Sequence, residues 1–262
     1  MNLKDNFQDD IIENNKFLYI WIDILGFRED LEYYEAFDKL FDIRENFINT
    51  FSTKSLNFDE IISISDGLLL IWKLSNLMYD NIKNIFDTIG ELQNNFILKY
   101  KKVIRGAIAV GNVSSNLYKS YNKGKEEREK YKDIFLISNG FLHAYKMESK
   151  DINWPIIATT DEELTKIRKT LNIDTNENFG LKKINGNNHI YLYMVDFLKP
   201  LEEKKDMRKD FEKFLSEKLK KYKEENINVY KKYLWLLLSY KNTYDDFIEE
   251  SFFEEYFKGI LL

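Results

Sequence analysis

The chain has 262 residues, 44% of them hydrophobic and 16% aromatic, which is enough to bury a substantial core in one domain, or in one domain with an appendage. It contains no cysteine, so disulfides, thiolate chemistry and thiolate zinc sites are excluded. The net charge of -5 makes duplex nucleic acid a poor partner, and because we find no apolar run near ~20 residues, no signal peptide and no anchor, we expect a cytoplasmic protein that binds no membrane.

The N-terminal part of the sequence predicts a strand, a helix and a β-hairpin. Residues 17–23 are rich in aromatic and β-branched residues, which is typical of a strand. After Gly26 the apolar residues of 30–51 recur at helical spacing. Residues 58–72 then predict a hairpin that turns at Ser65-Asp66-Gly67.

Helices and strands alternate over the next part of the chain, up to about residue 198. The expected elements are a helix over 77–100, a strand over 103–110, a basic arm over 119–132, a strand over 134–137 that enters a helix at Ser138, a strand over 155–159, a helix from Thr160, and a hairpin over 180–197. The excess of positive charge over residues 99–132 favours an anionic small molecule or an acidic partner surface, or it is that of a solvated loop.

Beyond Pro200 the pattern is helical only. An amphipathic, highly charged stretch is followed by VYKKYLWLLLSYKN, which is apolar enough to be buried against another surface. We therefore divide the chain into a domain of strands and helices, residues 1–198, and a C-terminal helical extension, residues 199–262.

Two aspartates occupy unusual places in the predicted strands. Asp23 ends a strand that otherwise reads as buried, and Asp66 lies at the hairpin turn. A buried carboxylate needs a compensating charge, and two carboxylates that converge at one sheet edge favour Mg²⁺ or Mn²⁺ between them. The alternative is that each aspartate is a cap or turn residue, which for Asp66 alone is the simpler interpretation.

The turn after Asp23 adds a second feature. Ile24-Leu25-Gly26-Phe27 leads directly into a predicted helix N-terminus, and Gly26 permits a close approach of the backbone to a ligand. Such a turn can hold phosphate groups with its backbone N–H groups. A metal beside a phosphate-binding turn indicates a nucleoside triphosphate, with two metals assisting attack and departure of pyrophosphate.

The order of these motifs resembles the catalytic domain of class III nucleotidyl cyclases over residues 16–197. The matching pieces are the strand ending in DILGF, the hairpin with SDG, the strand RGAIAVGNV, the helix end AYKMES, and PIIATT. The resemblance implies an α+β, ferredoxin-like domain with an antiparallel or mixed sheet, helices on one face, and a C-terminal helical appendage. It also implies a homodimer with shared active sites and two Mn²⁺ or Mg²⁺ ions per site, held by Asp23, Ile24 and Asp66.

Four positions depart from the purine-specific members of that family. Ile62 and about Phe135 stand where those cyclases read the base, and Leu142 and Lys146 stand where they have the transition-state asparagine and arginine. Lys146 keeps a positive charge that could reach a phosphate.

With these departures the sequence is similar to the bacterial pyrimidine cyclases of Pycsar antiphage systems. The likeness includes a C-terminal KYLWL…YKN stretch that begins at Lys232. It implies a uridylate or cytidylate cyclase, with UTP favoured over CTP, whose cyclic product activates a separate effector protein.

Further residues are candidates for nucleotide contacts. Arg105 lies within an apolar strand and needs a partner, which is either the triphosphate or base, or a structural carboxylate. Phe58 and Ile62 lie on the hairpin strand that lines the base pocket in the resemblance, although core packing is the competing role for Phe58. His143 and His189 are the only histidines, and we interpret both as packing or surface residues.

Three hypotheses of function follow. The first is a metal-dependent pyrimidine nucleotide cyclase that uses Asp23, Asp66, Arg105 and Lys146. The second is a degenerate cyclase domain that binds a nucleotide without turnover, motivated by Leu142. The third is a structural partner protein that uses its C-terminal helices.

Overall fold

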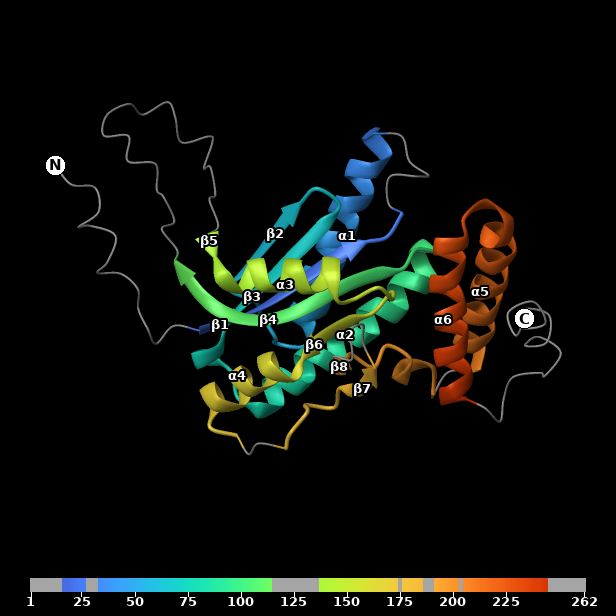
Figure 1. The fold of residues 1–262 in the computed structure, drawn as a ribbon. Coiled ribbons are helices and arrows are strands. Elements are labelled where there is room, and N and C mark those ends of the chain that lie inside the picture. Colours follow the sequence, from blue (N-terminus) through green and yellow to red (C-terminus); the bar gives the residue numbers. More distant parts are fainter. Residues whose placement is uncertain are drawn as a thin grey trace, which may run out of the picture.

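Within the part of the chain that the computed structural model describes, residues 16–26, 33–114, 137–173, 176–185, 191–202 and 205–244, eight strands form one mixed sheet (Figure 1). The strand order is β2-β3-β1-β4-β6-β8-β7, with β5 paired to β4 beside this path. The strands are β1 (Lys16–Ile24), β2 (Glu60–Ile64), β3 (Gly67–Lys73), β4 (Ile104–Ser114), β5 (Ile137–Ser138), β6 (Ile157–Thr160), β7 (Lys182–Asn185) and β8 (Tyr191–Met194).

Six α-helices accompany the sheet in the described residues. They are α1 (Tyr33–Thr53), α2 (Tyr79–Tyr100), α3 (Asn139–Lys150), α4 (Asp161–Leu171), α5 (Lys205–Glu225) and α6 (Ile227–Thr243), with short 3₁₀ helices η1 (Leu74–Asn76) and η3 (Lys199–Leu201). The predicted elements that fall on described residues are confirmed in type and order, with ends that differ by up to four residues. The basic arm over 119–132, Phe27, Phe135 and His189 lie outside the described residues.

The first half of the chain has the ferredoxin-like arrangement. Its elements follow the order β1-α1-β2-β3-α2-β4, and the strands lie in the order β2-β3-β1-β4. β1 is antiparallel to both β3 and β4, whereas β4 is parallel to β6. The α+β class and the mixed sheet are therefore confirmed by the strand pairing itself.

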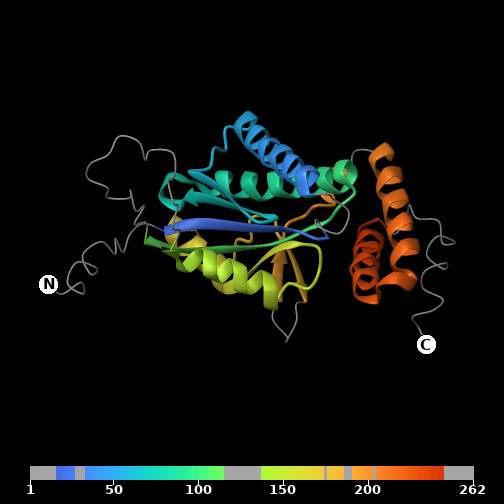
Figure 2. The same ribbon diagram turned by 90° about the horizontal axis from the view of Figure 1, so that it is seen from above.

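The two faces of the sheet are covered by different helices. Even-numbered residues of β1 such as Leu18 and Ile22 pack in one buried cluster with α1, α2 and α4. Odd-numbered residues such as Tyr19 and Trp21 pack in a second cluster that includes α3. Figure 2 shows α1 and α2 on one side of the sheet and α3 on the other. The sequence predicted helices on one face of the sheet only. In the structure α3 covers the other face, beside the odd-numbered residues of β1.

The C-terminal helices α5 and α6 form an antiparallel hairpin at one end of the sheet (Figures 1 and 2). Asn226 joins them and caps α6, because its side chain accepts hydrogen bonds from the backbone of Asn228 and Val229. Trp235 of α6 stacks on Trp154 with ring centroids 5.6 Å apart. The hairpin shares the α3-side cluster with the sheet, so its apolar surface is buried against the first part of the chain.

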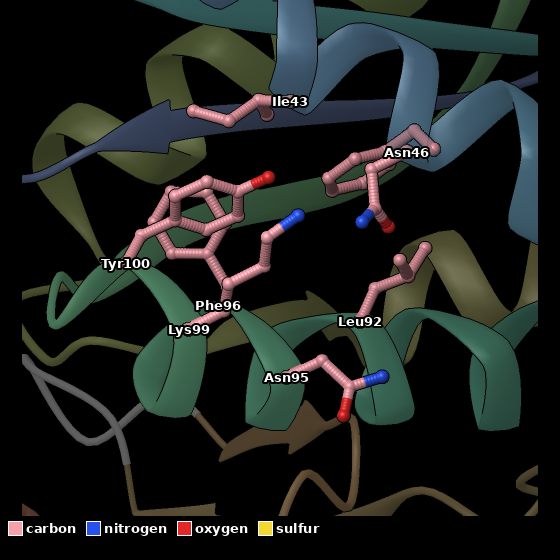
Figure 3. A pocket seen from close by; sticks show the side chains of 8 residues that line it. Ile43, Asn46, Leu92, Asn95, Phe96, Lys99 and Tyr100 are labelled. Carbon is pink, nitrogen blue, oxygen red and sulfur yellow. The ribbon is translucent and has the colours of Figure 1, made fainter. Parts of the chain in front are cut away.

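Two further findings concern surfaces and cavities. Among the described residues, no helix is long and apolar enough to cross a membrane. Figure 3 shows a pocket between α1 and α2, beside Asn46 and Lys99, with a volume of about 10 Å³. This space holds at most about one water molecule, so we assign it to helix packing and not to a ligand.

Candidate active site

Asp23 lies at the end of β1, on the sheet face that α3 covers. It pairs in register with Gly67 of β3 on one side and with Arg105 of β4 on the other. Its side chain is 25% exposed. Because side chains alternate along a strand, Asp23 shares its face with Trp21 and not with the buried Ile22.

Asp66 is brought to the same end of the β1–β3 pair by a tight turn. Ile64 pairs with Gly67, so the hairpin loop contains only Ser65 and Asp66, and Ser65 has a positive φ of 57°. Gly67 belongs to the strand and not to the loop. A Cβ on Gly67 would lie 2.2 Å from the Trp21 ring, so its glycine serves close packing.

Arg105 joins Asp23 to an acidic residue of α3. Its guanidinium lies 3.5 Å from the Asp23 carboxylate and forms a close ion pair with Glu148. It also donates to the Ile152 carbonyl at 3.4 Å. Arg105 therefore supplies the compensating charge that the partly buried Asp23 needs. This ion pair is the structural role that the sequence offered for Arg105 as the alternative to a nucleotide contact.

Sequence reasoning did not assign a role to Glu148. It was included only in the AYKMES match. Glu148 lies four residues after Ala144 on the same face of α3, and this spacing indicates that its charge is buried. The Glu148 side chain is 5% exposed, so it requires the Arg105 partner that the fold provides.

Both carboxyl groups are perturbed by their surroundings. Burial raises the pKa of Asp23, and the nearby Asp66 charge raises it further, while Arg105 and Lys232 act in the opposite direction. Burial likewise raises the pKa of Glu148, with Asp23 adding to the rise and Arg105 opposing it. Asp66 directly precedes Gly67, the register partner of Asp23, so the two aspartates lie at the same end of neighbouring strands, as predicted from the sequence.

The turn after β1 has the geometry expected of a close-approach site. Gly26 has a φ of 66°, a left-handed conformation that favours glycine. Leu25 donates its N–H to the Val103 carbonyl at 3.0 Å, and Lys102 Nζ donates to the Gly26 carbonyl at 2.5 Å. The turn is thereby fixed against the start of β4, with a lysine ammonium group beside it.

The predicted site residues are not all together. Phe58 packs against Phe51 and Trp72, with ring centroids 6.0 and 5.9 Å away, on the face opposite Asp23. Ile62 lies on the Asp23 face, against the α3-side cluster. Lys146 is exposed and lines an open pocket of about 480 Å³ with His143, away from the Asp23 cluster. In this single chain, therefore, neither the Phe58 side chain nor the Lys146 side chain belongs to the group around Asp23.

The donor set at the end of β1 suits a hard divalent cation. Asp23 and Asp66 supply two carboxylates whose mutual repulsion a cation would relieve. The Ile24 side chain is buried in the cluster on the other face, so Ile24 could contribute only its backbone carbonyl oxygen. Within the described residues, no group of three or more histidine, aspartate or glutamate side chains is placed to hold a metal ion.

The raised pKa of Asp23 predicts the pH dependence of metal binding. Only the carboxylate binds a cation, and a pKa above the usual 3.8 means that protons compete at higher pH than for an ordinary aspartate. A raised carboxyl pKa in the folded state also means that the metal-free protein gains stability as the pH falls through that pKa. We expect Mn²⁺ affinity, measured by calorimetry from about pH 8 downward, to fall before ordinary carboxyl groups titrate. An affinity that stays constant until ordinary carboxyl groups titrate would contradict this assignment.

The sequence matches no protein-family model, and comparison with curated proteins finds no match. Among solved structures, the chain is similar to the adenylyl cyclase CyaB from P. aeruginosa, with 14% identity and a TM-score of 0.46 over 69% of this chain and 93% of that one. It is also similar to the guanylyl cyclase domain of the RhoGC fusion protein from the aquatic fungus Blastocladiella emersonii, with 12% identity and a TM-score of 0.47 over 70% and 95%. A third similar structure is the guanylate cyclase domain of RhGC from Catenaria anguillulae in complex with GTP, with 12% identity and a TM-score of 0.46 over 70% and 96%. The α+β architecture assigned above follows from the strand order of this chain alone.

Proposed function

We propose that the chain is a metal-dependent nucleotide cyclase that converts a pyrimidine nucleoside triphosphate, with UTP favoured, into the 3′,5′-cyclic nucleotide and pyrophosphate. One observation carries the proposal: Asp23 and Asp66 lie at the same strand end, beside a glycine turn that can approach a phosphate. The ferredoxin-like order of the strands supports it, because β3 lies beside β1 and the β2–β3 turn therefore lies next to the end of β1.

The proposed reaction forms one bond and breaks one. The ribose 3′-oxygen bonds to the α-phosphorus, the bond from that phosphorus to the oxygen bridging to the β-phosphate breaks, and the hydroxyl proton passes to water. When bound, Mg²⁺ or Mn²⁺ would lower the pKa of the attacking hydroxyl and neutralise charge on the leaving pyrophosphate. Asp23 and Asp66 would hold the cations, and the turn at Gly26 would lie beside the phosphates.

The choice of a pyrimidine rests on the resemblance of the sequence. Ile62 stands where purine cyclases place a base-reading lysine, and it packs as an apolar side chain on the Asp23 face. CTP is the alternative substrate. We further propose that two protomers share their active sites, with Lys146 of one reaching a phosphate in the other, and that the cyclic product activates a separate antiphage effector in the cytoplasm.

Incubation of the purified protein with Mn²⁺ or Mg²⁺ and each of the four common nucleoside triphosphates tests the proposal. We expect a cyclic product and pyrophosphate from UTP, or from CTP, and none from ATP or GTP. A protein that cyclises only purine nucleotides would contradict the pyrimidine assignment. Tight binding of a nucleotide without any product, measured by calorimetry, would instead support a degenerate binding module. This alternative is motivated by Leu142, which stands where purine cyclases have an asparagine and is 51% exposed.

A further inference from the structure

The C-terminal hairpin and the turn after β1 enclose a cavity of about 110 Å³. On one side lie Leu25 and Gly26 of the turn with Lys102 at the start of β4, and on the other lie Lys218 of α5 and Lys232 of α6. The volume is several times the roughly 10–15 Å³ that one water molecule requires. The cavity therefore has room for a hydrated ion or a phosphate group next to the turn.

The charged lining of this cavity consists of lysines. Three lysines line it, all of them half-buried, and none of the described residues that line it is acidic. Lysine side chains around one space favour anions, because partly buried charges are screened less than exposed ones. Lysine is a frequent phosphate ligand of the point-charge type.

The lysines come from segments that the fold holds firmly. Lys102 Nζ donates to the Gly26 carbonyl at 2.5 Å, which ties it to the turn. Tyr222 of α5 and Tyr233 of α6 also line the cavity, and their rings stack with centroids 5.7 Å apart and planes inclined by 4°, which fixes α5 against α6. The two helices thus present their lysines as one preorganised unit.

The cavity also adjoins the acidic cluster of the candidate active site. Leu25 and Gly26, which line the cavity, follow Asp23 by two and three residues, and the positive charge of Lys232 acts on both Asp23 and Glu148. A ligand in the cavity would therefore extend from the lysines toward Asp23 and Asp66, which is the direction from a polyphosphate tail to its metal-bound reacting end. Neither the pocket between α1 and α2 nor the open pocket at Lys146 is lined by a residue of this turn.

We propose that this cavity binds the polyphosphate of the nucleotide substrate, with Lys218 and Lys232 of the C-terminal hairpin acting together with Lys102 as phosphate ligands. This inference rests on the proposed cyclase function and adds residues from outside the ferredoxin-like part of the chain to its active site. The C-terminal hairpin is then a component of the substrate site and not only a structural appendage.

Inorganic tripolyphosphate is the probe that tests the cavity without requiring turnover. We expect Lys218→Gln and Lys232→Gln each to weaken tripolyphosphate binding, measured by calorimetry on the full chain, by about tenfold or more, because each removes one charge-assisted hydrogen bond. Lys232→Arg should retain most of the affinity. Lys231→Gln is the matched control, since Lys231 is the exposed neighbour of Lys232 on α6 and should bind as the unmodified protein does.

Thermal unfolding of each variant establishes that it is folded, and the nucleotide assay separates the two proposals. If a cyclic product forms and both glutamine variants bind tripolyphosphate as tightly as the unmodified chain, the cavity assignment is overturned while the cyclase function stands. If no nucleotide is cyclised but tripolyphosphate binding still requires Lys218 and Lys232, the cavity assignment is supported and the cyclase function fails. A raised KM for the nucleotide in both variants, beside weaker tripolyphosphate binding, supports both.

Discussion

Asp23→Asn and Asp66→Asn should each lower the rate of cyclic nucleotide formation by about 100-fold or more, because loss of a metal ligand costs at least as much as loss of a group that supports one. An amide of the same shape cannot replace the charge that holds a divalent cation. Mn²⁺ affinity, measured by calorimetry, should fall in parallel with the rate.

The same variants should not unfold the protein. Since burial raises the pKa of Asp23, the folded state disfavours its charge, and the neutral amide should leave the melting temperature of the metal-free protein unchanged or higher. Asp42→Asn, an exposed aspartate on α1, is the control and should keep full activity. Full turnover by Asp66→Asn would refute the metal assignment for that residue.

Arg105→Met should destabilise the fold by about 3 kcal/mol, because it leaves Asp23 and Glu148 as neighbouring carboxylates without their shared cation. We choose the lower end of the range for broken buried pairs because the Arg105 side chain is 19% exposed and water can partly solvate the site. Urea unfolding at about pH 7.5 measures the loss.

The loss should shrink on acidification. Without Arg105 the folded-state pKa values of both carboxyl groups rise further above their unfolded values, so the penalty is present at high pH and is relieved as the pH falls through the folded pKa. Added Glu148→Gln should recover part of the stability at about pH 7.5, because it removes one of the two carboxylates. A loss that is independent of pH, and is not reduced by Glu148→Gln, would show that Arg105 acts through packing alone.

Local patterns predicted most of the fold because those elements are determined by nearby residues. The aromatic and β-branched run 17–23 became β1, and the regular apolar spacing of 77–100 became α2. Thr160 caps α4 as its position before three acidic residues indicated, with its side chain accepting from Glu163. The placement of Asp23 and Asp66 at one end of the sheet could also be predicted, because Asp23 lies at the end of β1 and Asp66 lies in the turn that begins the neighbouring β3.

The remaining parts of the site depend on tertiary contacts that spacing does not encode. Glu148 reaches Arg105 only because α3 lies on the face opposite α1 and α2. Phe58 was a candidate for contact with the base, with core packing as its competing role. It precedes β2, and its ring packs with Trp72 of β3 on the α1 side of the sheet. Lys232 lies far from Asp23 in sequence, and only the docking of the C-terminal hairpin makes its charge felt there.

The placement of Glu148 on α3 gives this helix two functions at once. Toward the sheet its Glu148 pairs with Arg105, and on its outer surface Leu142 is 51% exposed. Tyr145 is 50% exposed, and its ring contacts Trp21 of β1 with centroids 6.1 Å apart. One short helix therefore connects an exposed surface to the ion pair beside Asp23, so a contact that displaced α3 would also displace the Glu148 carboxylate.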